Sequence, residues 1–415
     1  QLFLVPGLIV AGLVVVWLLF NVRSSLDRKL QEILAELDSD NPEVRWRAAE
    51  NLARALPSDE RTRLHVGFAL DLAVRLRGGL TRSEVAERDR LKRFLARKQS
   101  VAEETADLKS LEQDRKYLLF LTACQGYFVA PVGAPLLAEM ALPQPGIEPS
   151  ALHHRREFAL FALSSLGESL NKFDALPQDR QEELLRDLHE EAERRNERGQ
   201  LARQAHAYLS ARRHGRNSNA LNVTLALIRC AYDDDPYFRK LAAHAMSFWG
   251  DDGTQPVRAR ATVAALLSAP TGSGPLLAAA SLFPGRMDGV ERALLRLALD
   301  DGQGTDPDER DRERREIRYN AVIALARQGA PVVKRFLPVL EEMLDLEKQK
   351  TLCVAPEEQN AAVIVMGTLK AVARLHQKNR GLDLSALEPA LDRLIDSGNR
   401  QLAEEAKDVR DQLAH

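Results

Sequence analysis

The chain has 415 residues, of which 45% are hydrophobic and 28% are charged. These fractions exclude an intrinsically disordered chain and a protein built mainly of membrane spans. The formal net charge is only −2, so bulk charge offers no general attraction for nucleic acid or for an anionic surface. Aromatic residues make up 5% of the chain, and this scarcity favours helices over strands. The cysteines, Cys124, Cys230 and Cys353, are odd in number and far apart, which predicts free thiols in a reducing compartment.

An uncharged apolar run occupies residues 2–20, and the first charged residue after it is Arg23. About 20 helical residues, at roughly 1.5 Å each, cross a hydrocarbon core of roughly 30 Å. The run therefore predicts one transmembrane helix over residues 1–22. A signal peptide and a buried core helix are the alternatives, although the run is long for a signal peptide and lacks a small-residue cleavage site. The expected anchor residues are Leu2, Phe3, Leu4, Val5, Leu8, Ile9, Val10, Leu13, Val14, Val15, Val16, Trp17, Leu18, Leu19 and Phe20.

Basic residues follow the apolar run at Arg23, Arg28 and Lys29. Positive charges close to a span tend to stay on the cytoplasmic side. We therefore expect a single-pass protein of the cytoplasmic (inner) membrane, with residues 23–36 as a connection and first helix and the rest of the chain in the cytoplasm. Basic residues before Gln1 would reverse this orientation and place the body on the periplasmic or extracytoplasmic side.

From residue 37 onward, a short helical pattern returns along the chain. Its clearest copy is DSDNPEVRWRAA at residues 38–49, and related copies lie at residues 234–246 and 317–325. In the first copy, Asp40 can cap a helix and Pro42 suits the first turn, while Val44, Ala48 and Leu52 recur on one face. That face is expected to be buried.

Aligning the three copies predicts weaker ones between them. The aligned positions are 45, 115, 156, 198, 239, 275, 318, 358 and 400, which gives a first gap of 70 residues and later intervals of 36 to 43. Two helices in about 40 residues is the unit length of armadillo and HEAT arrays. Small alanines recur three residues after most of these positions, as at Ala48, Ala159 and Ala242, which would allow neighbouring helices to approach closely.

Residues 37–415 resemble the HEAT-repeat family in this pattern. The resemblance implies an all-α fold, namely a HEAT-like α-solenoid of about nine to ten two-helix repeats, here preceded by the transmembrane helix. In that family a turn Asp and a helix Arg often form a ladder between repeats. The resemblance gives this role to Asp40 with Arg45, to Asp235 with Arg239, and to Arg318. The family includes scaffolds, transport factors and subunits of enzyme complexes, so it specifies no activity.

A second apolar stretch covers residues 117–138. Pro131, Gly133 and Pro135 interrupt it, and it falls in register with the repeats. We predict buried helices of the solenoid here, and a second membrane span is the alternative.

Candidate chemistry is absent from the sequence. The histidines have no zinc-binding spacing, residues 271–274 lack the Gly-Lys-Ser/Thr of a phosphate loop, and the acidic residues 300–308 do not match a calcium loop. We therefore predict a protein without catalytic, cofactor-binding or metal-binding residues and without a small-molecule substrate.

A basic segment lies at residues 75–98. It could contact anionic lipid or an acidic partner, although a solvated helix face is the alternative. Nucleic acid is disfavoured because Phe94 alone could stack on a base. The expected contact residues are Arg88, Arg90, Lys92, Arg93, Arg97 and Lys98.

These features predict a non-catalytic, membrane-anchored scaffold or accessory subunit that binds other proteins of a membrane complex through the solenoid surface. One alternative is an adaptor that binds nucleic acid or anionic lipid through residues 75–98. Another is a HEAT-like enzyme.

Overall fold

A computed structural model describes residues 28–95, 101–144, 149–214, 218, 220–249, 289–299, 307–353 and 358–414. All regular secondary structure in these residues is helical, as the composition predicts. Residues 1–22, where the sequence predicts a transmembrane helix, lie outside the described part. Among the described residues, no helix is both long and apolar enough to cross a membrane.

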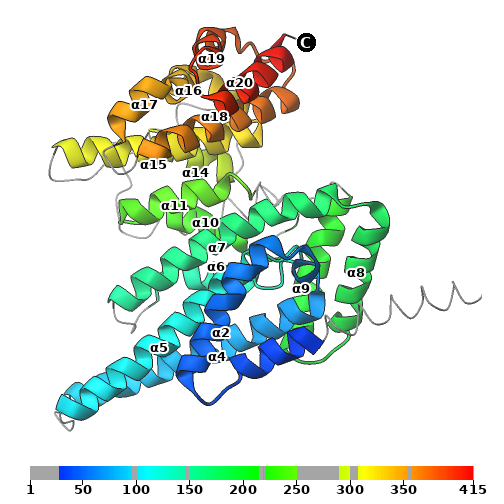
Figure 1. Cartoon of the computed structure of the whole chain (residues 1–415), viewed down its shortest axis with the longest axis vertical. Coiled ribbons are helices and arrows are strands. Elements are labelled where there is room, and N and C mark those ends of the chain that lie inside the picture. The colour runs from blue at the N-terminus through cyan, green and yellow to red at the C-terminus, as the bar shows by residue number, and fades with distance from the viewer. Residues whose placement is uncertain are drawn as a thin grey trace, which may run out of the picture.

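Within the described ranges, the helices follow one another along the chain with short connections (Figure 1). After a helix over residues 28–37 come α2 (Pro42–Ala55), η1 (Leu56–Ser58), α3 (Glu60–Arg63), α4 (Val66–Leu95), α5 (Val101–Gln125), α6 (Ala134–Ala141), α7 (Pro149–Ala175), α8 (Gln178–Ala192), α9 (Glu197–Arg213), α10 (Val223–Ala231), α11 (Pro236–Met246), α14 (Gly289–Ala298), α15 (Pro307–Gln328), η2 (Pro331–Phe336), α16 (Leu337–Leu344), α17 (Leu346–Leu352), α18 (Glu358–Lys378), η3 (Ser385–Leu387), α19 (Glu388–Ile395) and α20 (Arg400–Leu413).

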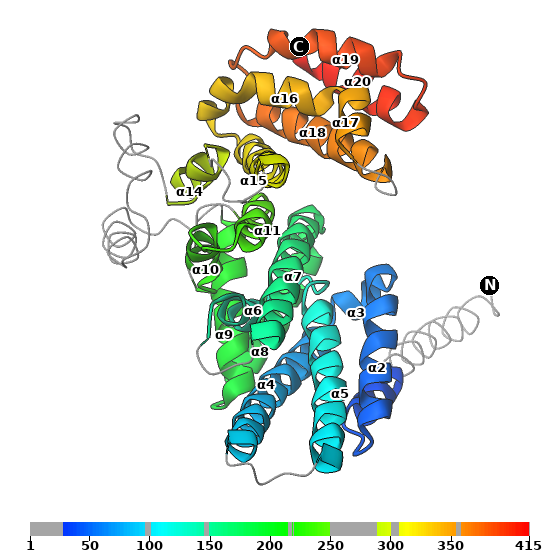
Figure 2. The same cartoon turned by 90° about the vertical axis from the view of Figure 1, so that its left-hand side faces the viewer.

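One layer of helices runs through the molecule. Helices α2, α5, α7, α11, α15, α18 and α20 pack on one another in this order, so that each contacts the next. Most of them also pair with the preceding helix in a hairpin, as in α4–α5, α6–α7, α10–α11, α14–α15 and α19–α20. Figure 2 shows this succession from α2 and α5 up to α18 and α20. Stacked helical hairpins of this kind form an α-solenoid.

The hairpin α8–α9 departs from the stacking order. These two helices pack on each other and on α4, at one side of the molecule, while α7 packs directly on α11 (Figure 1). Arg198 on α9 therefore does not lie between α7 and α11, where the even spacing predicts it. Its guanidinium instead binds Glu191 at 2.8 Å and Asp71 on α4. The prediction of an uninterrupted array is wrong at this hairpin, because α9 buries its apolar face against α8.

Asn-Pro and Asp-Pro pairs start two of the helices in the layer. The Asn41 side chain accepts a hydrogen bond from the Glu43 amide at 2.9 Å, and Asp235 accepts one from Tyr237 at 2.8 Å. A proline follows each cap at the first helical position, where its missing N–H costs nothing. The prediction that Asp40 caps α2 is wrong, because the residue directly before Pro42 occupies the cap position.

The buried face of α2 is partly as predicted. Ala48, Ala49 and Leu52 are buried, which confirms two of the three expected positions. Val44 is 40% exposed, so its assignment to that face is wrong. Farther along the layer, the predicted small residues Ala159, Ala242, Ala321 and Ala361 are all buried. A methyl side chain at the contact lets neighbouring helices approach closely.

The predicted ladder pair of Asp40 with Arg45 is replaced by another contact. Arg45 pairs with Asp114 on α5 at 2.8 Å, rather than with Asp40. Arg239 donates to the backbone carbonyls of Asp233 and Asp234, both at 3.0 Å, and Asp235 is used as a helix cap. While Asp235 Oδ1 caps α11, its Oδ2 lies 3.9 Å from His153 Nδ1 of α7.

Arg318, the remaining residue of the predicted ladder, is half-buried on α15. An ion pair of the predicted kind does connect neighbouring hairpins through other residues, because Arg156 of α7 pairs with Asp233 in the turn before α11.

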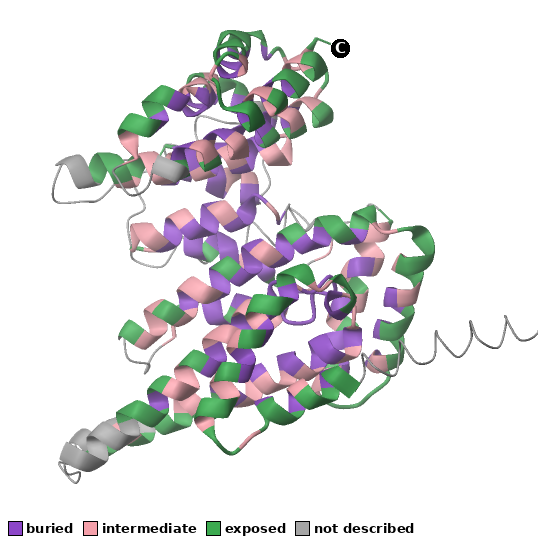
Figure 3. Ribbon diagram, viewed as in Figure 1, coloured by how far each residue is buried: buried purple, intermediate pink, exposed green. Residues whose placement is uncertain are grey.

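The apolar stretch at residues 117–138 belongs to the interior. Tyr117, Leu121, Phe128 and Leu137 are all buried, in the end of α5, the following turn and α6. Figure 3 shows the buried residues running along the centre of the stacked helices. The prediction of buried solenoid helices is confirmed.

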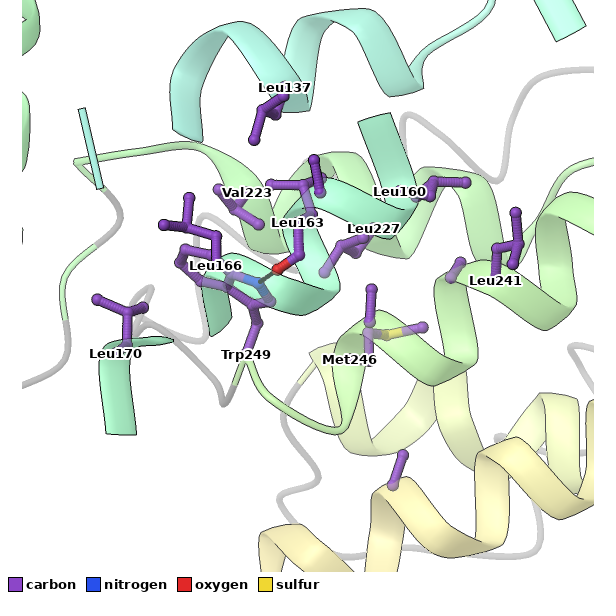
Figure 4. Close-up of a cluster of buried hydrophobic side chains, with 14 of the residues drawn as sticks. Leu137, Leu160, Leu163, Leu166, Leu170, Val223, Leu227, Leu241, Met246 and Trp249 are labelled. Carbon is purple, nitrogen blue, oxygen red and sulfur yellow. Dashed lines mark hydrogen bonds between the residues drawn. The ribbon is translucent and has the colours of Figure 1, made fainter. Parts of the chain in front are cut away.

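A cluster around Trp249 joins α6, α7, α10 and α11 (Figure 4). The Trp249 indole N–H donates to the Leu163 carbonyl at 2.7 Å, while Leu137, Leu227 and Met246 pack nearby. Because this hydrogen bond satisfies the one polar group of the indole, the ring can be buried without an unpaired donor.

Substitution in the layer tests this packing. Ala243 on α11 is fully buried, so Ala243→Asp would bury a carboxylate without a partner and lower the free energy of unfolding by about 3 kcal/mol or more. Ala207→Asp makes the same change at an exposed position of α9 and should cost less than about 1 kcal/mol. Urea unfolding followed by circular dichroism measures both. Equal losses would contradict the assignment of α11 to the layer.

The stability should also depend on pH through His244 on α11. Burial, assisted by Arg327, lowers the pKa of His244 from 6.5 to about 4. Below pH 6.5 the unfolded chain therefore binds a proton at this residue that the folded chain does not bind. The free energy of unfolding falls as the pH drops from about 6.5 towards 4. We expect a loss of about 1 to 2 kcal/mol between pH 7 and pH 5 from this residue.

The matched variant is His244→Gln, which keeps a polar side chain of similar size and does not titrate. Burial and His189 also lower the pKa of His206, so part of the pH dependence should survive in this variant. Unfolding free energies measured at pH 5, 6 and 7 should show a shallower slope for His244→Gln than for the unmodified chain. An identical slope would show that His244 protonates freely in the folded state.

Candidate functional site

The candidate site is a pocket between α4, α5, α6 and α7. Its position follows from a close crossing of α4 and α5 at Gly79, where an added Cβ atom would lie 2.6 Å from Leu118 Cδ2. Helix α6 has only eight residues and ends at Ala141, so it covers a small part of the long neighbouring helices. The space left between α4, α5 and the start of α7 is a pocket of about 400 Å³.

The floor of the pocket is apolar. Leu80 of α4, Leu118 and Leu119 of α5 and Met140 of α6 line it. Thr122 also lines it, but its hydroxyl donates to the Leu118 carbonyl at 2.7 Å and is therefore already satisfied. An apolar group that enters the pocket meets hydrocarbon, so its removal from water drives binding.

Ion pairs surround this floor. Arg155 Nη1 of α7 lies 2.8 Å from Glu84 Oε1 of α4, and Arg115 Nε of α5 lies 3.2 Å from Glu87 Oε1. These pairs are half-buried or better, since the Arg155 and Glu87 side chains are only 12% and 11% exposed. These charged residues form the rim of the pocket. The rim joins α4, α5 and α7 and carries charges of both signs.

A third pair lies farther out on α5. Lys116 Nζ is 2.9 Å from Glu112 Oε1, and this hydrogen bond lowers the pKa of the Glu112 carboxyl. Both side chains are well exposed, so the pair is accessible to a binding partner. With its charges paired, the rim does not favour a ligand of one sign.

His154 adds a directional polar group to the rim. Its Nδ1 lies 2.9 Å from the Ser150 carbonyl oxygen. Because a carbonyl can only accept, Nδ1 carries the proton in this contact, and Nε2 of the neutral ring is an acceptor. The pocket therefore combines an apolar floor with hydrogen-bonding groups at its edge, and its volume falls in the range typical of ligand sites.

The basic segment of the sequence lies on the last turns of α4. Arg90 is half-buried, and Lys92 and Arg93 are exposed, with Lys92 Nζ 3.3 Å from Asp89. Arg97 and Lys98 lie outside the described residues, as does the side chain of Arg88. Helix α5 packs beside α4.

The predicted anchor residues lie outside the described part of the chain. Within that part, no group of three or more His, Cys, Asp or Glu side chains is placed to hold a metal ion.

Sequence reasoning missed the pocket. Four helices supply its walls, and the ion pair Glu84–Arg155 joins residues that are 71 positions apart. The acidic and basic side chains around the pocket are equal in number, so a search of the sequence for an excess of one charge does not detect it. The only local signal is the Gly78–Gly79 pair inside a helix, which indicates a close helix contact but not a cavity.

Comparison with known proteins assigns no family. No protein-family model matches the chain, and no curated protein matches it. Solved structures do match, and one of them is described as the crystal structure of an engineered protein. It is 13% identical, the alignment covers 93% of this chain and 99% of that chain, and the TM-score is 0.23. A TM-score of this size does not indicate a shared fold, and the fold is assigned here from the packing of the helices themselves.

A double-mutant cycle tests the rim of the pocket. Glu84→Gln, Arg155→Met and the double variant should give a coupling free energy of about 1 kcal/mol in urea unfolding, because the pair is largely removed from water. The exposed pair Arg400–Glu404 on α20 is the control, and its coupling should lie within the error of the measurement. Equal coupling in the two cycles would show that solvent screens Glu84 and Arg155 in the folded protein.

Proposed function

We propose that the chain is a non-catalytic scaffold that binds another protein through the surface of its helical stack. The observation that carries this proposal is the apolar pocket with a paired, neutral rim at the junction of two neighbouring hairpins. A solenoid displays a long surface on which each hairpin adds a further contact. A pocket in that surface gives a partner a place to bury an apolar group, which is the typical basis of an interaction hot spot.

The proposal extends to the membrane. The apolar run at residues 2–20 would hold the solenoid at the bilayer, and Arg23, Arg28 and Lys29 favour a solenoid on the cytoplasmic side. The partner would then be another subunit of a membrane complex. We also propose that the repeats are of the HEAT type, as the cap-proline starts of α2 and α11 and the spacing of the repeats support.

Truncation tests the anchor. Deleting residues 1–22 should release the protein into the soluble fraction with its helical circular dichroism intact, because the described helices bury a core of their own. The full chain should stay with membranes after a high-salt wash. A truncated chain that still sediments with membranes would mean that residues 1–22 are not the attachment.

Site-specific cross-linking tests the scaffold. The exposed valines Val44, Val85 and Val363 lie on α2, α4 and α18, and each can be replaced by a photoreactive amino acid in the full chain. Irradiation in native membranes should give a covalent adduct with a discrete second protein from at least one of these positions. If all three positions give no adduct, the proposed scaffold function is contradicted.

A further inference from the structure

We infer that the pocket between α4 and α7 receives a large apolar side chain, best a tryptophan, from an amphipathic helix of the partner protein. This inference rests on the proposed scaffold function and names the chemistry of the contact. It follows from the size of the pocket, from the state of its charges and from the row of side chains that continues from it along α5.

The size fits side chains rather than a whole lipid. A water molecule occupies about 30 Å³ of liquid, so a pocket of about 400 Å³ corresponds to roughly a dozen water molecules. A tryptophan side chain, with part of a neighbouring residue, fits within that space. A whole phospholipid is several times larger.

The charges indicate an uncharged group at the centre. Arg155 is already bound to Glu84 and Arg115 to Glu87, so a charged ligand would have to break a half-buried ion pair to gain another. An indole avoids this cost and brings one N–H donor. Acceptors for that N–H line the pocket in the side chains of Ser83, Ser150 and His154, which favours tryptophan over phenylalanine or leucine.

The surface of α5 continues the site beyond the pocket. Leu108, Glu112 and Leu119 lie on one face of α5, at i, i+4 and i+11, and Leu108 is 41% exposed. Eleven helical residues span roughly 16 Å. A partner helix lying along α5 can therefore place one apolar residue in the pocket and a second on Leu108, about three turns away.

Charge complementarity fixes what lies between these two contacts. Glu112 and Lys116 are 65% and 48% exposed and occupy the middle of the α5 face. A basic and an acidic residue on the partner helix can pair with them, as along the edge of a coiled coil. The occupant is thus an amphipathic helix with two apolar residues three turns apart and charges of both signs between them.

Selection of helical peptides tests the inference. A phage-displayed library of amphipathic helices is selected against the full chain in mild detergent, and the affinities of the selected peptides are measured by fluorescence anisotropy. The selected sequences should share a tryptophan or another large apolar residue and a second apolar residue eleven positions away.

Ala151→Trp, which fills the pocket from α7, should weaken binding at least tenfold, and Leu119→Glu should do the same from α5. Phe161→Ala removes an exposed apolar side chain of α7 outside the pocket and should leave the affinity unchanged. Circular dichroism identifies any variant that does not fold. If one pocket variant does not fold, the affinity of the other pocket variant tests the inference.

Three results would overturn the inference. The selection could yield no helical peptide, or the selected peptides could bind Ala151→Trp and Leu119→Glu as tightly as the unmodified chain. Alternatively, dodecan-1-ol could bind the unmodified chain and bind Ala151→Trp more weakly, while no peptide binds. That result would assign the pocket to a small apolar molecule. If Val363 were the only position that gave a cross-link, the scaffold function would be supported, but the binding surface would lie away from the pocket. The two proposals can therefore fail independently.

Discussion

The close contact of each helix in the layer with the next is the constraint on which the rest of the structure depends. Small buried residues such as Ala159, Ala242, Ala321 and Ala361 allow it, because a larger side chain would push neighbouring helices apart. Every hairpin buries its apolar face only by stacking on another hairpin, so no unit has a complete core alone. A charge placed in one contact should therefore weaken the neighbouring hairpins as well.

The pocket is a consequence of unequal helix lengths in the two hairpins α4–α5 and α6–α7. Helices α4, α5 and α7 have 30, 25 and 27 residues, whereas α6 has eight. The long helices extend past the end of α6 and face one another with an apolar floor between them. Ion pairs from Arg155 and Arg115 to the two glutamates of α4 hold the open side together. Regular stacking would close this space, so the site depends on an irregularity of the repeat.

The sequence predicts what local chemistry determines. The helix start at Pro42, the buried alanines at regular spacing and the burial of residues 117–138 all follow from proline in the first turn, periodicity and apolar composition. It does not predict which helices meet, because that depends on distant surfaces. Arg198 fits the repeat spacing, yet its helix packs on α8 and α4, and Arg45 finds Asp114 rather than Asp40. The sequence does not predict the pocket for the same reason, because its walls come from helices that are distant in the sequence.

The direct packing of α7 on α11 is the central claim, and intramolecular cross-linking tests it most directly. The rings of His153 and Tyr237 stack with their centroids 5.4 Å apart, whereas even repeat spacing would place position 198 beside α11. In a Cys353→Ser background, His153→Cys with Tyr237→Cys should react within one chain with a short bis-maleimide, and Arg198→Cys with Tyr237→Cys should not. Cross-linking of 198 to 237 without cross-linking of 153 to 237 would contradict the structure described above.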